Sequence, residues 1–235
     1  TAPTTLEQNA IHTFVIADKA SGNWALRDDI WIRSLGSVNG LIGKNKTGVA
    51  SGGVTWSLDG ALYDGTTGYI DDNFDLGIDG VNYTASNANV GYFVKTKPTS
   101  GGLTPIGGVY DGANQMIFYG NGTFMNAFIN DDTIDTTGLP VLGLESNKVY
   151  GCVTDGTTPD LLIDGVISTR NRVDNVNAVP TGQNLYEGAR NLNGAVDIYA
   201  DSEISVSYIG AESGFDHVAN NTDIRQLLLD LGLTL

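Results

Sequence analysis

The segment Leu161-Leu162-Ile163-Asp164-Gly165-Val166-Ile167-Ser168-Thr169 contains the pattern from which we predict the fold. Two short runs of strand-forming residues flank an Asp-Gly pair, and such pairs readily adopt the positive φ angles of a tight hairpin turn. The pattern recurs along the chain, so we predict a series of antiparallel hairpins. The further Asp-Gly and Asn-Gly pairs begin at Asp59, Asp64, Asp79, Asp111, Asp155, Asn39, Asn121 and Asn193.

Short strand-like runs lie between these turns. Many short strands separated by turns about 8–12 residues apart are typical of a β-sandwich or barrel. We therefore predict an all-β fold in one domain over residues 1–235, with an antiparallel β-sandwich at 30–210. The runs are 30–35, 54–58, 90–96, 107–110, 115–119, 123–129, 148–154, 161–163, 166–169, 184–188, 195–199 and 204–209.

A short helix is predicted near each terminus. At 4–22, Thr5 and Gln8 have the spacing of a capping box. Apolar residues then recur every three or four positions, as they do on one face of a helix. This helix is expected to pack its apolar stripe against the body of the domain.

The second helix is predicted at 221–232. Asn221 or Thr222 can cap its start, and Gly232 can adopt the left-handed conformation that ends a helix. Apolar residues again form one face, so this helix is also expected to dock on the sandwich.

The charge of the chain excludes several classes of protein. Its formal net charge is −15, from 12 Lys and Arg against 27 acids, and 22 of those acids are Asp. Nucleic-acid binding depends on Lys and Arg that neutralise phosphates, so we expect no nucleic-acid partner. No run approaches the roughly 18 apolar residues of a membrane span, so we expect no membrane partner.

Cysteine and histidine offer little chemistry. Cys152 is the single cysteine, which excludes an internal disulfide and a Cys-based zinc site. It lies in an apolar strand pattern and is predicted to be a small core residue. His12 and His217 are the two histidines, and we expect both to be ordinary surface or capping residues.

Several segments in order resemble concanavalin A-like (laminin G-like) sandwich domains. With the opening helix and Trp24…Trp31, the series resembles sandwich domains of bacteriophage virion proteins over about residues 5–232. The resemblance implies a jelly-roll-like sandwich on a virus particle, in a fibre, spike or capsid decoration, often associated with surface glycans. It carries over no defined catalytic or metal-binding residues. The segments are Asp64-Gly65-Thr66-Thr67-Gly68-Tyr69-Ile70 with Asn73-Phe74, Val90-Gly91-Tyr92-Phe93-Val94, Leu161-Leu162-Ile163-Asp164-Gly165, Leu185-Tyr186-Glu187-Gly188-Ala189-Arg190-Asn191 and Ile204-Ser205-Val206-Ser207-Tyr208-Ile209-Gly210.

We consider three hypotheses for the function of the protein. The leading one is a non-enzymatic structural protein on the virion surface that adheres to glycans or to the host surface. The second is a purely structural capsid decoration or head-fibre subunit, whose helices dock on other virion proteins or on copies of itself as a homo-oligomer. The third is a glycan-degrading enzyme.

The enzyme hypothesis lacks the required acids. Glycosidases need two carboxyl groups across the scissile bond, and some proteins of this fold use a Glu-x-Asp-x-x-Glu strand. None of the five glutamates lies in that pattern. Asp71-Asp72 and Asp131-Asp132 are adjacent pairs that would face opposite sides of a strand, and we interpret them as solvated loop acids.

Carbohydrate binding needs aromatic faces for the sugar ring and amides or carboxylates for its hydroxyls. The alternative for each aromatic residue is that it fills the core, and Trp24, Trp31 and Trp56 are predicted as core anchors. The candidates near predicted turns are Tyr83, Tyr110, Tyr119, Phe124, Tyr186 and Tyr199, with the polar neighbours Asn121 and Asn126.

One acidic cluster is a candidate for calcium, the only cofactor considered. Calcium loops take oxygen ligands from alternating positions, as this cluster could supply. Leu76 stands where such a loop needs Gly, and Asn82 stands where it needs a bidentate Glu. The alternative is a turn-rich acidic loop without metal. The cluster is Asp71, Asn73, Asp75 and Asp79.

Overall fold

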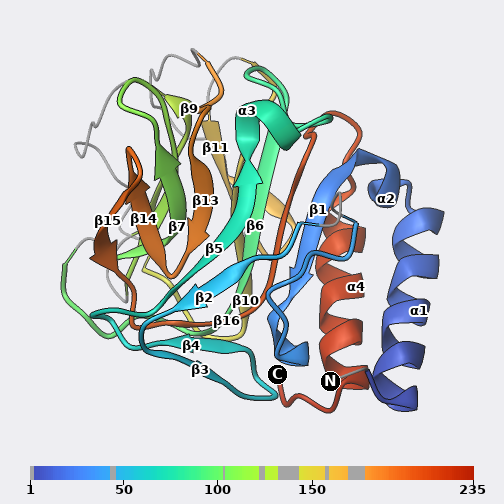
Figure 1. Cartoon of the computed structure of the whole chain (residues 1–235). Coiled ribbons are helices and arrows are strands. Elements are labelled where there is room, and N and C mark those ends of the chain that lie inside the picture. Colours follow the sequence, from blue (N-terminus) through green and yellow to red (C-terminus); the bar gives the residue numbers. More distant parts are fainter. Residues whose placement is uncertain are drawn as a thin grey trace.

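The chain folds into two β-sheets stacked face to face, with a layer of helices against one of them (Figure 1). We call the sheet beneath the helices the inner sheet and the other the outer sheet. The predicted β-sandwich with a helix near each end is confirmed. The computed structural model describes residues 3–42, 46–102, 104–121, 125–131, 143–156, 159–168 and 178–235.

The inner sheet is antiparallel throughout. Its β11–β12 hairpin is the Asp-Gly turn predicted from the sequence, with Ile163 paired to Val166 and positive φ angles at Asp164 and Gly165. Across the sheet the strands are β12 (Val166–Ser168), β11 (Pro159–Ile163), β10 (Lys148–Thr154), β6 (Ala88–Thr96), β16 (Glu203–Gly210), β4 (Ala61–Tyr63) and β3 (Val54–Trp56), with β1 (Arg27–Ile32) also paired to β16.

The outer sheet brings together strands that are far apart in the sequence. Its pairs are antiparallel except for β14, which runs parallel to β7. The main path is β15 (Ala195–Tyr199), β14 (Ala189–Leu192), β7 (Pro105–Tyr110), β13 (Asn184–Glu187), β5 (Tyr69–Asp75) and β2 (Val49–Ser51), and β8 (Gln115–Gly120) joins β7 to β9 (Met125–Asp131).

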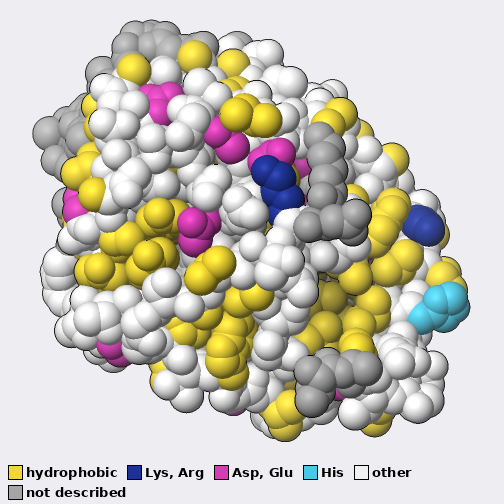
Figure 2. All heavy atoms as spheres, viewed as in Figure 1, with side chains coloured by type: hydrophobic (Ala, Val, Ile, Leu, Met, Phe, Trp, Pro, Cys, Tyr) yellow, Lys and Arg dark blue, Asp and Glu magenta, His cyan; other side chains and the backbone are white. Residues whose placement is uncertain are grey.

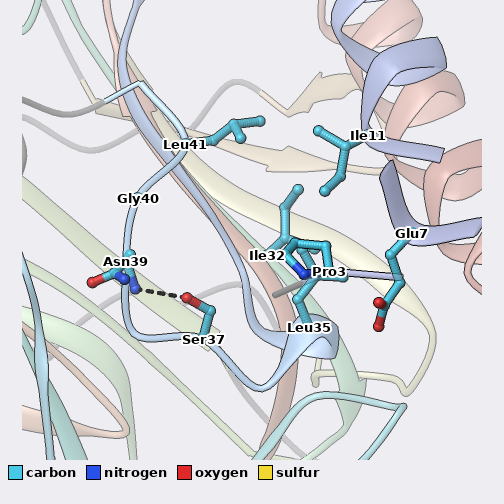
Figure 3. A pocket seen from close by; sticks show the side chains of 9 residues that line it. All are labelled: Pro3, Glu7, Ile11, Ile32, Leu35, Ser37, Asn39, Gly40 and Leu41. Atoms are coloured by element: carbon cyan, nitrogen blue, oxygen red, sulfur yellow. Dashed lines mark hydrogen bonds between the residues drawn. The ribbon is translucent and has the colours of Figure 1, made fainter. Parts of the chain in front are cut away.

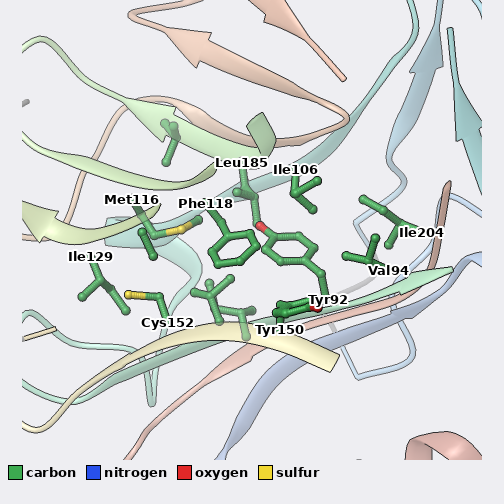
Figure 4. Packing of buried hydrophobic residues seen from close by; sticks show 14 of the residues in the cluster. Tyr92, Val94, Ile106, Met116, Phe118, Ile129, Tyr150, Cys152, Leu185 and Ile204 are labelled. Carbon is green, nitrogen blue, oxygen red and sulfur yellow. The ribbon is translucent and has the colours of Figure 1, made fainter. Parts of the chain in front are cut away.

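The main hydrophobic core lies between the two sheets. Phe118 of the outer sheet stacks against Tyr92 and Tyr150 of the inner sheet, with ring centroids 6.0 and 6.4 Å apart (Figure 4). Cys152 is buried in this core, as predicted. Trp31 is 2% exposed and is a core anchor. The other two tryptophans pack at the edges of cores while staying partly exposed.

A second core lies between the inner sheet and the helical layer. Phe14 of α1 (Thr5–Ala20) and Ile224 of α4 (His217–Asp230) pack there with Phe93 and Val206 of the sheet.

No helix in the described part of the chain is long and apolar enough to cross a membrane. The shorter helical turns are α2 (Asn23–Leu26), η1 (Arg33–Leu35) and α3 (Leu76–Asp79).

The start of α1 differs from the prediction by one residue. Thr4, and not Thr5, is the N-cap, and its hydroxyl accepts a hydrogen bond from the Glu7 amide while the Glu7 carboxylate accepts from the Thr4 amide. The Gln8 side chain donates instead to the carbonyl of Pro3. A carboxylate at the third position makes this box stronger than a glutamine would, because its acceptor is charged.

The start of α4 was also predicted wrongly. Asp216 caps the helix, which begins at His217, six residues before a Thr222 cap would have placed it. Asn221 is inside the helix, and its side-chain amide donates a hydrogen bond to the backbone carbonyl of Asp164 at 3.1 Å. Gly232 follows the last turn with a φ of 93°, as predicted for the C-terminal end.

Candidate functional site

The outer sheet has one surface that faces away from the sandwich. Along β5, Ile70 and Phe74 point into the core, so Tyr69 and Asp71 point outward, because side chains alternate along a strand. The same alternation on β13 directs Leu185 inward and Tyr186 outward. We call this surface the outer face.

Three tyrosines from distant parts of the chain meet on the outer face. The Tyr69 ring lies 4.9 Å from the Tyr186 ring, centroid to centroid, and 6.4 Å from the Tyr199 ring. They come from β5, β13 and β15, and we call them the tyrosine cluster. Tyr69 and Tyr199 are half-buried, whereas Tyr186 is 9% exposed. Tilted rings at a solvent-facing surface offer apolar faces of the kind that sugars contact.

The Tyr186 hydroxyl is held in its neutral form. Partial burial raises the pKa of Tyr186 to about 12, and the charge of Asp71 and the neighbouring Tyr69 act in the same direction. At neutral pH this hydroxyl therefore remains protonated and can donate a hydrogen bond.

Polar side chains border the tyrosine cluster. The Asp71 carboxylate accepts a hydrogen bond from the backbone amide of Asn73 at 2.7 Å and another from the Asn184 side chain at 3.3 Å. The Asn184 contact links β5 to β13 beside Tyr186. A carboxylate and an amide next to aromatic rings supply the donors and acceptors that sugar hydroxyls require.

A second group of outward side chains lies across β7. Arg190 of β14 forms a two-pronged ion pair with Asp197 of β15, in which Nε donates to Oδ1 at 2.9 Å. Its Nη1 also donates to the hydroxyl of Tyr119 at 2.9 Å. Asp197 and Tyr199 lie two positions apart on β15 and therefore share a face, which connects this ion pair to the tyrosine cluster.

A buried polar cluster lies directly behind the tyrosine cluster. Arg33 of η1 donates to both carboxylates of Asp72 and Glu187, with Nε 3.1 Å from Glu187 Oε1. The hydroxyls of Tyr63 and Ser207 donate to the same Glu187. All five side chains are at most 3% exposed. We call them the Arg33 cluster.

The Arg33 cluster contains one more carboxylate than cation. The pKa of Asp72 is raised to about 8, because burial and the charge of Glu187 together outweigh the opposing effect of Arg33. Asp72 and Glu187 are the chain neighbours of Asp71 and Tyr186. The Arg33 cluster therefore holds β5 and β13 together on their inner side, at the position where the tyrosines lie on the outer side.

The sequence was misleading at Asp72. It was interpreted as a solvated loop acid with Asp71, but both residues lie in β5 and Asp72 is 2% exposed. The reason is the ion pair with Arg33, a residue 39 positions away, which no local pattern reveals. In the other acidic pair, Asp132 and the side chain of Asp131 lie outside the described residues.

The predicted carbohydrate-binding residues fall into three groups. Tyr186 and Tyr199 lie together in the tyrosine cluster. Tyr119 contacts Arg190 on the outer face, and Tyr110 packs against the small apolar cluster to which Tyr119 belongs. The others are buried or undescribed: Tyr83, Asn121 and Asn126 are at most 2% exposed, and Phe124 lies outside the described residues.

Three residues of the site were not predicted as sugar ligands. Tyr69 and Asn184 were not singled out for this role, and Asp71 was considered as a calcium ligand and as a solvated loop acid. The segment 69–74 reads Tyr-Ile-Asp-Asp-Asn-Phe, and Asp72 interrupts the alternation of apolar and polar residues that would mark a strand with one exposed face, so Tyr69 and Asp71 had no clear local signal. Nothing local indicated that β13 would lie beside it.

The candidate calcium ligands do not converge on one point. Asp71 faces Asn184, while Asp75 accepts hydrogen bonds from the amides of Gly77 and Gly182. Asp79 pairs with Lys46 and accepts from the Asp75 amide. Asn73, the fourth candidate, has a φ of 52°. Within the described ranges, no three His, Cys, Asp or Glu side chains are grouped as metal ligands.

His217 was predicted at the surface, but its side chain is buried. It is 6% exposed, its Nε2 lies 2.8 Å from Glu212 Oε2, and its ring contacts Phe215. The carboxylate and the aromatic ring stabilise the imidazole in the loop before α4, so this histidine has a structural partner and no access to the outer face.

A cavity of about 310 Å³ lies elsewhere, between α1 and the loop after η1. Ile11, Ile32 and Leu41 point toward its interior, with Glu7 at its edge (Figure 3). It contains none of the predicted site residues. Figure 2 shows this apolar hollow beside α1 and, separately, hydrophobic side chains gathered on the surface over β5, β13 and β15.

Comparison with known proteins places the chain among β-sandwich domains. No protein-family model matches, and no curated protein sequence matches. Among solved structures, domain 4 of AbnA, a GH43 extracellular arabinanase from Geobacillus stearothermophilus in complex with arabinotriose, aligns with a TM-score of 0.52 and 14% identity. That alignment covers 82% of this chain and 97% of the domain.

Two longer proteins contain the same fold. A Trypanosoma rangeli sialidase mutant displaying trans-sialidase activity aligns with a TM-score of 0.62 and 12% identity over 92% of this chain. The binding domain of botulinum neurotoxin serotype D aligns at 0.56 and 11% identity over 84%. The chain spans only 39% of the sialidase and 52% of the neurotoxin domain, and identities this low establish the fold alone.

Proposed function

We propose that this protein is a non-enzymatic, lectin-like β-sandwich that binds glycans through the tyrosine cluster. The observation that carries the proposal is the meeting of Tyr69, Tyr186 and Tyr199 on the outer face, bordered by Asp71 and Asn184. A sugar ring would stack on the tyrosines while its hydroxyls bond to the polar side chains.

The fold neighbours support this proposal. One is an arabinanase domain solved with a bound arabinotriose, and another is the binding domain of a neurotoxin. The Arg33 cluster adds a physical argument, since it fixes the strands that carry the tyrosines. A site held rigid before the ligand arrives loses less conformational entropy on binding.

We further propose that the protein lies on the outer surface of a bacteriophage particle, where glycan binding would attach the particle to its host. The basis is the ordered resemblance of the sequence segments to virion sandwich domains. Mass spectrometry of purified particles should then detect this chain, and antibody-gold electron microscopy should place it on the exterior. Its consistent absence from particles would refute this location.

The proposal of a non-enzymatic role rests on the chemistry of the outer face. Glycosidases pair a protonated carboxyl group with an ionised one across the sugar bond. In the described structure the carboxyl group with a strongly raised pKa, Asp72, is sealed between the sheets. We therefore expect no new reducing ends when polysaccharides are incubated with the protein, and their appearance would favour a hydrolase.

The decisive experiment compares two substitutions at Tyr186. Tyr186→Ala removes the ring and should weaken glycan binding at least about tenfold, as for a central aromatic contact. Tyr186→Phe keeps the ring and should retain most of the affinity. Leu229→Ala, at an exposed position on α4, is the surface control. Equal affinity of all variants in calorimetry would remove the tyrosine cluster as the site.

A further inference from the structure

The charges around the tyrosine cluster bear on which sugars it can accept, an inference that rests on the proposed glycan-binding function. The eight strands of the outer sheet contain a single cationic residue, Arg190. Sugars with carboxylate, sulfate or phosphate groups are normally held by Arg or Lys. Whether Arg190 is available therefore decides between acidic and neutral ligands.

Arg190 is already neutralised. Its Nε and Nη2 donate to the two oxygens of Asp197, and its Nη1 donates to Tyr119. Its side chain is 13% exposed and that of Asp197 is 25% exposed. An anionic sugar would have to displace Asp197 from this two-pronged ion pair and would leave that carboxylate without its partner. Such an exchange has no net gain in charge pairing.

The remaining charges near the site are unfavourable to anions. Asp71 is the register partner of Tyr186 across β5 and β13, and its charge contributes to the raised pKa of that hydroxyl. Lys46, which precedes β2, is paired with Asp79. The chain as a whole has a formal net charge of −15, which repels anionic ligands at a distance.

We propose that the tyrosine cluster selects uncharged oligosaccharides and rejects those with acidic groups. Stacking on Tyr69 and Tyr186 needs only the apolar face of a sugar ring, and Asp71 and Asn184 bond to neutral hydroxyls. The Arg190–Asp197 pair acts as the specificity determinant, because it neutralises the one cation that the described strands of the outer sheet could offer to an acidic group.

The first test is a glycan array with matched neutral and acidic members, such as lactose with sialyllactose and a mannan hexamer with a mannuronate hexamer. We expect signal on neutral members, with acidic counterparts at least about tenfold weaker. Equal or stronger signal on acidic members would overturn the neutral preference while leaving glycan binding intact. No signal on any member would instead refute the proposed function.

The second test makes Arg190 available to a ligand by removing its ion-pair partner. Asp197→Asn removes the paired carboxylate and should raise the affinity for the acidic member of a bound pair at least about tenfold. Glu145→Gln is the matched control, because it removes one negative charge at a residue that is paired to Lys148 near the inner sheet. Thermal unfolding checks that both variants fold. If the two variants change acidic binding equally, the preference comes from net charge and not from the Arg190–Asp197 pair, and the assignment fails.

Discussion

The two ends of β1 carry buried arginines that are stabilised in different ways. Arg27, at the start of β1, points into the helical core and forms a two-pronged ion pair with Asp18 of α1, with nitrogen–oxygen distances of 2.7 and 2.8 Å. Its guanidinium also lies 5.0 Å from the ring centroids of Tyr208 and Phe215. One cation thus meets one carboxylate, within a cage of aromatic rings.

Arg33, just after β1, points into the core between the sheets and meets two carboxylates, Asp72 and Glu187. Burying two negative charges with one positive charge is unfavourable, and the structure relieves this by favouring the protonated form of Asp72. In the Arg27 pair, one positive charge cancels one negative charge. In the Arg33 cluster, the charges cancel only when Asp72 carries a proton. Only the second should depend strongly on pH in the neutral range.

The largest effect should come from removing Arg33. Arg33→Met leaves the ionised Glu187 without its cation and the protonated Asp72 without its hydrogen-bond donor, and breaking a buried ion pair in this way costs about 3–5 kcal/mol. Arg27→Met leaves only Asp18 unpaired, so it should be less destabilising. Urea unfolding of both variants measures the difference. A smaller loss for Arg33→Met than for Arg27→Met would contradict the proposed difference between the clusters.

The same substitution at the two clusters should then give unequal results. Asp18→Asn leaves the buried Arg27 without a counter-charge and should cost about 3 kcal/mol or more at pH 7. Asp72→Asn replaces a carboxyl group that is already largely protonated at that pH, so it should cost much less. Equal losses in urea unfolding would show that Asp72 is ionised in the folded protein.

The pH dependence of stability should have a defined sign. The folded-state pKa of Asp72 is raised to about 8 from an unfolded value near 3.9. Between these values the folded state binds the extra proton, so this contribution to stability is full below about pH 4 and is lost as the pH rises through about 8. Thermal unfolding from pH 5 to 9 should show a decline that is shallower in Asp72→Asn. An identical slope in both proteins would rule out Asp72 as the source.

The smallest effect should come from an exposed carboxylate. Asp64 accepts hydrogen bonds from the backbone amides of Thr66, Thr67 and Gly68, and these contacts lower its pKa. Asp64→Ala should cost about 1 kcal/mol, as for a capping side chain, and this stability should be lost as the pH falls through the acid range. Unfolding at pH 7 and pH 3 provides the measurement. A loss as large as that of Asp18→Asn would break the distinction between exposed and buried carboxylates.

The sequence was informative where a few adjacent residues determine the structure. Asp164-Gly165 needs only its own backbone preferences to form a turn, and the hairpin lies where it was predicted. The apolar stripes of both helices were likewise local. Helix starts were less predictable, because several polar residues near Thr5 and Thr222 can cap, and the choice depends on tertiary partners such as the Asp164 carbonyl.

The site depends on which strands become neighbours, and no short segment encodes that. Tyr186 and Tyr199 were proposed singly, whereas their partner Tyr69 lies more than a hundred residues away in the sequence. The burial of Asp72 likewise follows from contact with Arg33 and Glu187, which only the assembled sandwich brings together. Charged residues in a strand look solvated until their partners are known.

The order of the layers determines how the protein would present itself when attached to a support. The start of α1 and the end of α4 lie side by side at one end of the helical layer, and the tyrosine cluster is on the opposite side of the sandwich (Figure 1). A tether at either helix would therefore leave the tyrosines directed outward. Many copies on one scaffold could then engage a polymeric ligand together, and weak single contacts would add up to strong avidity.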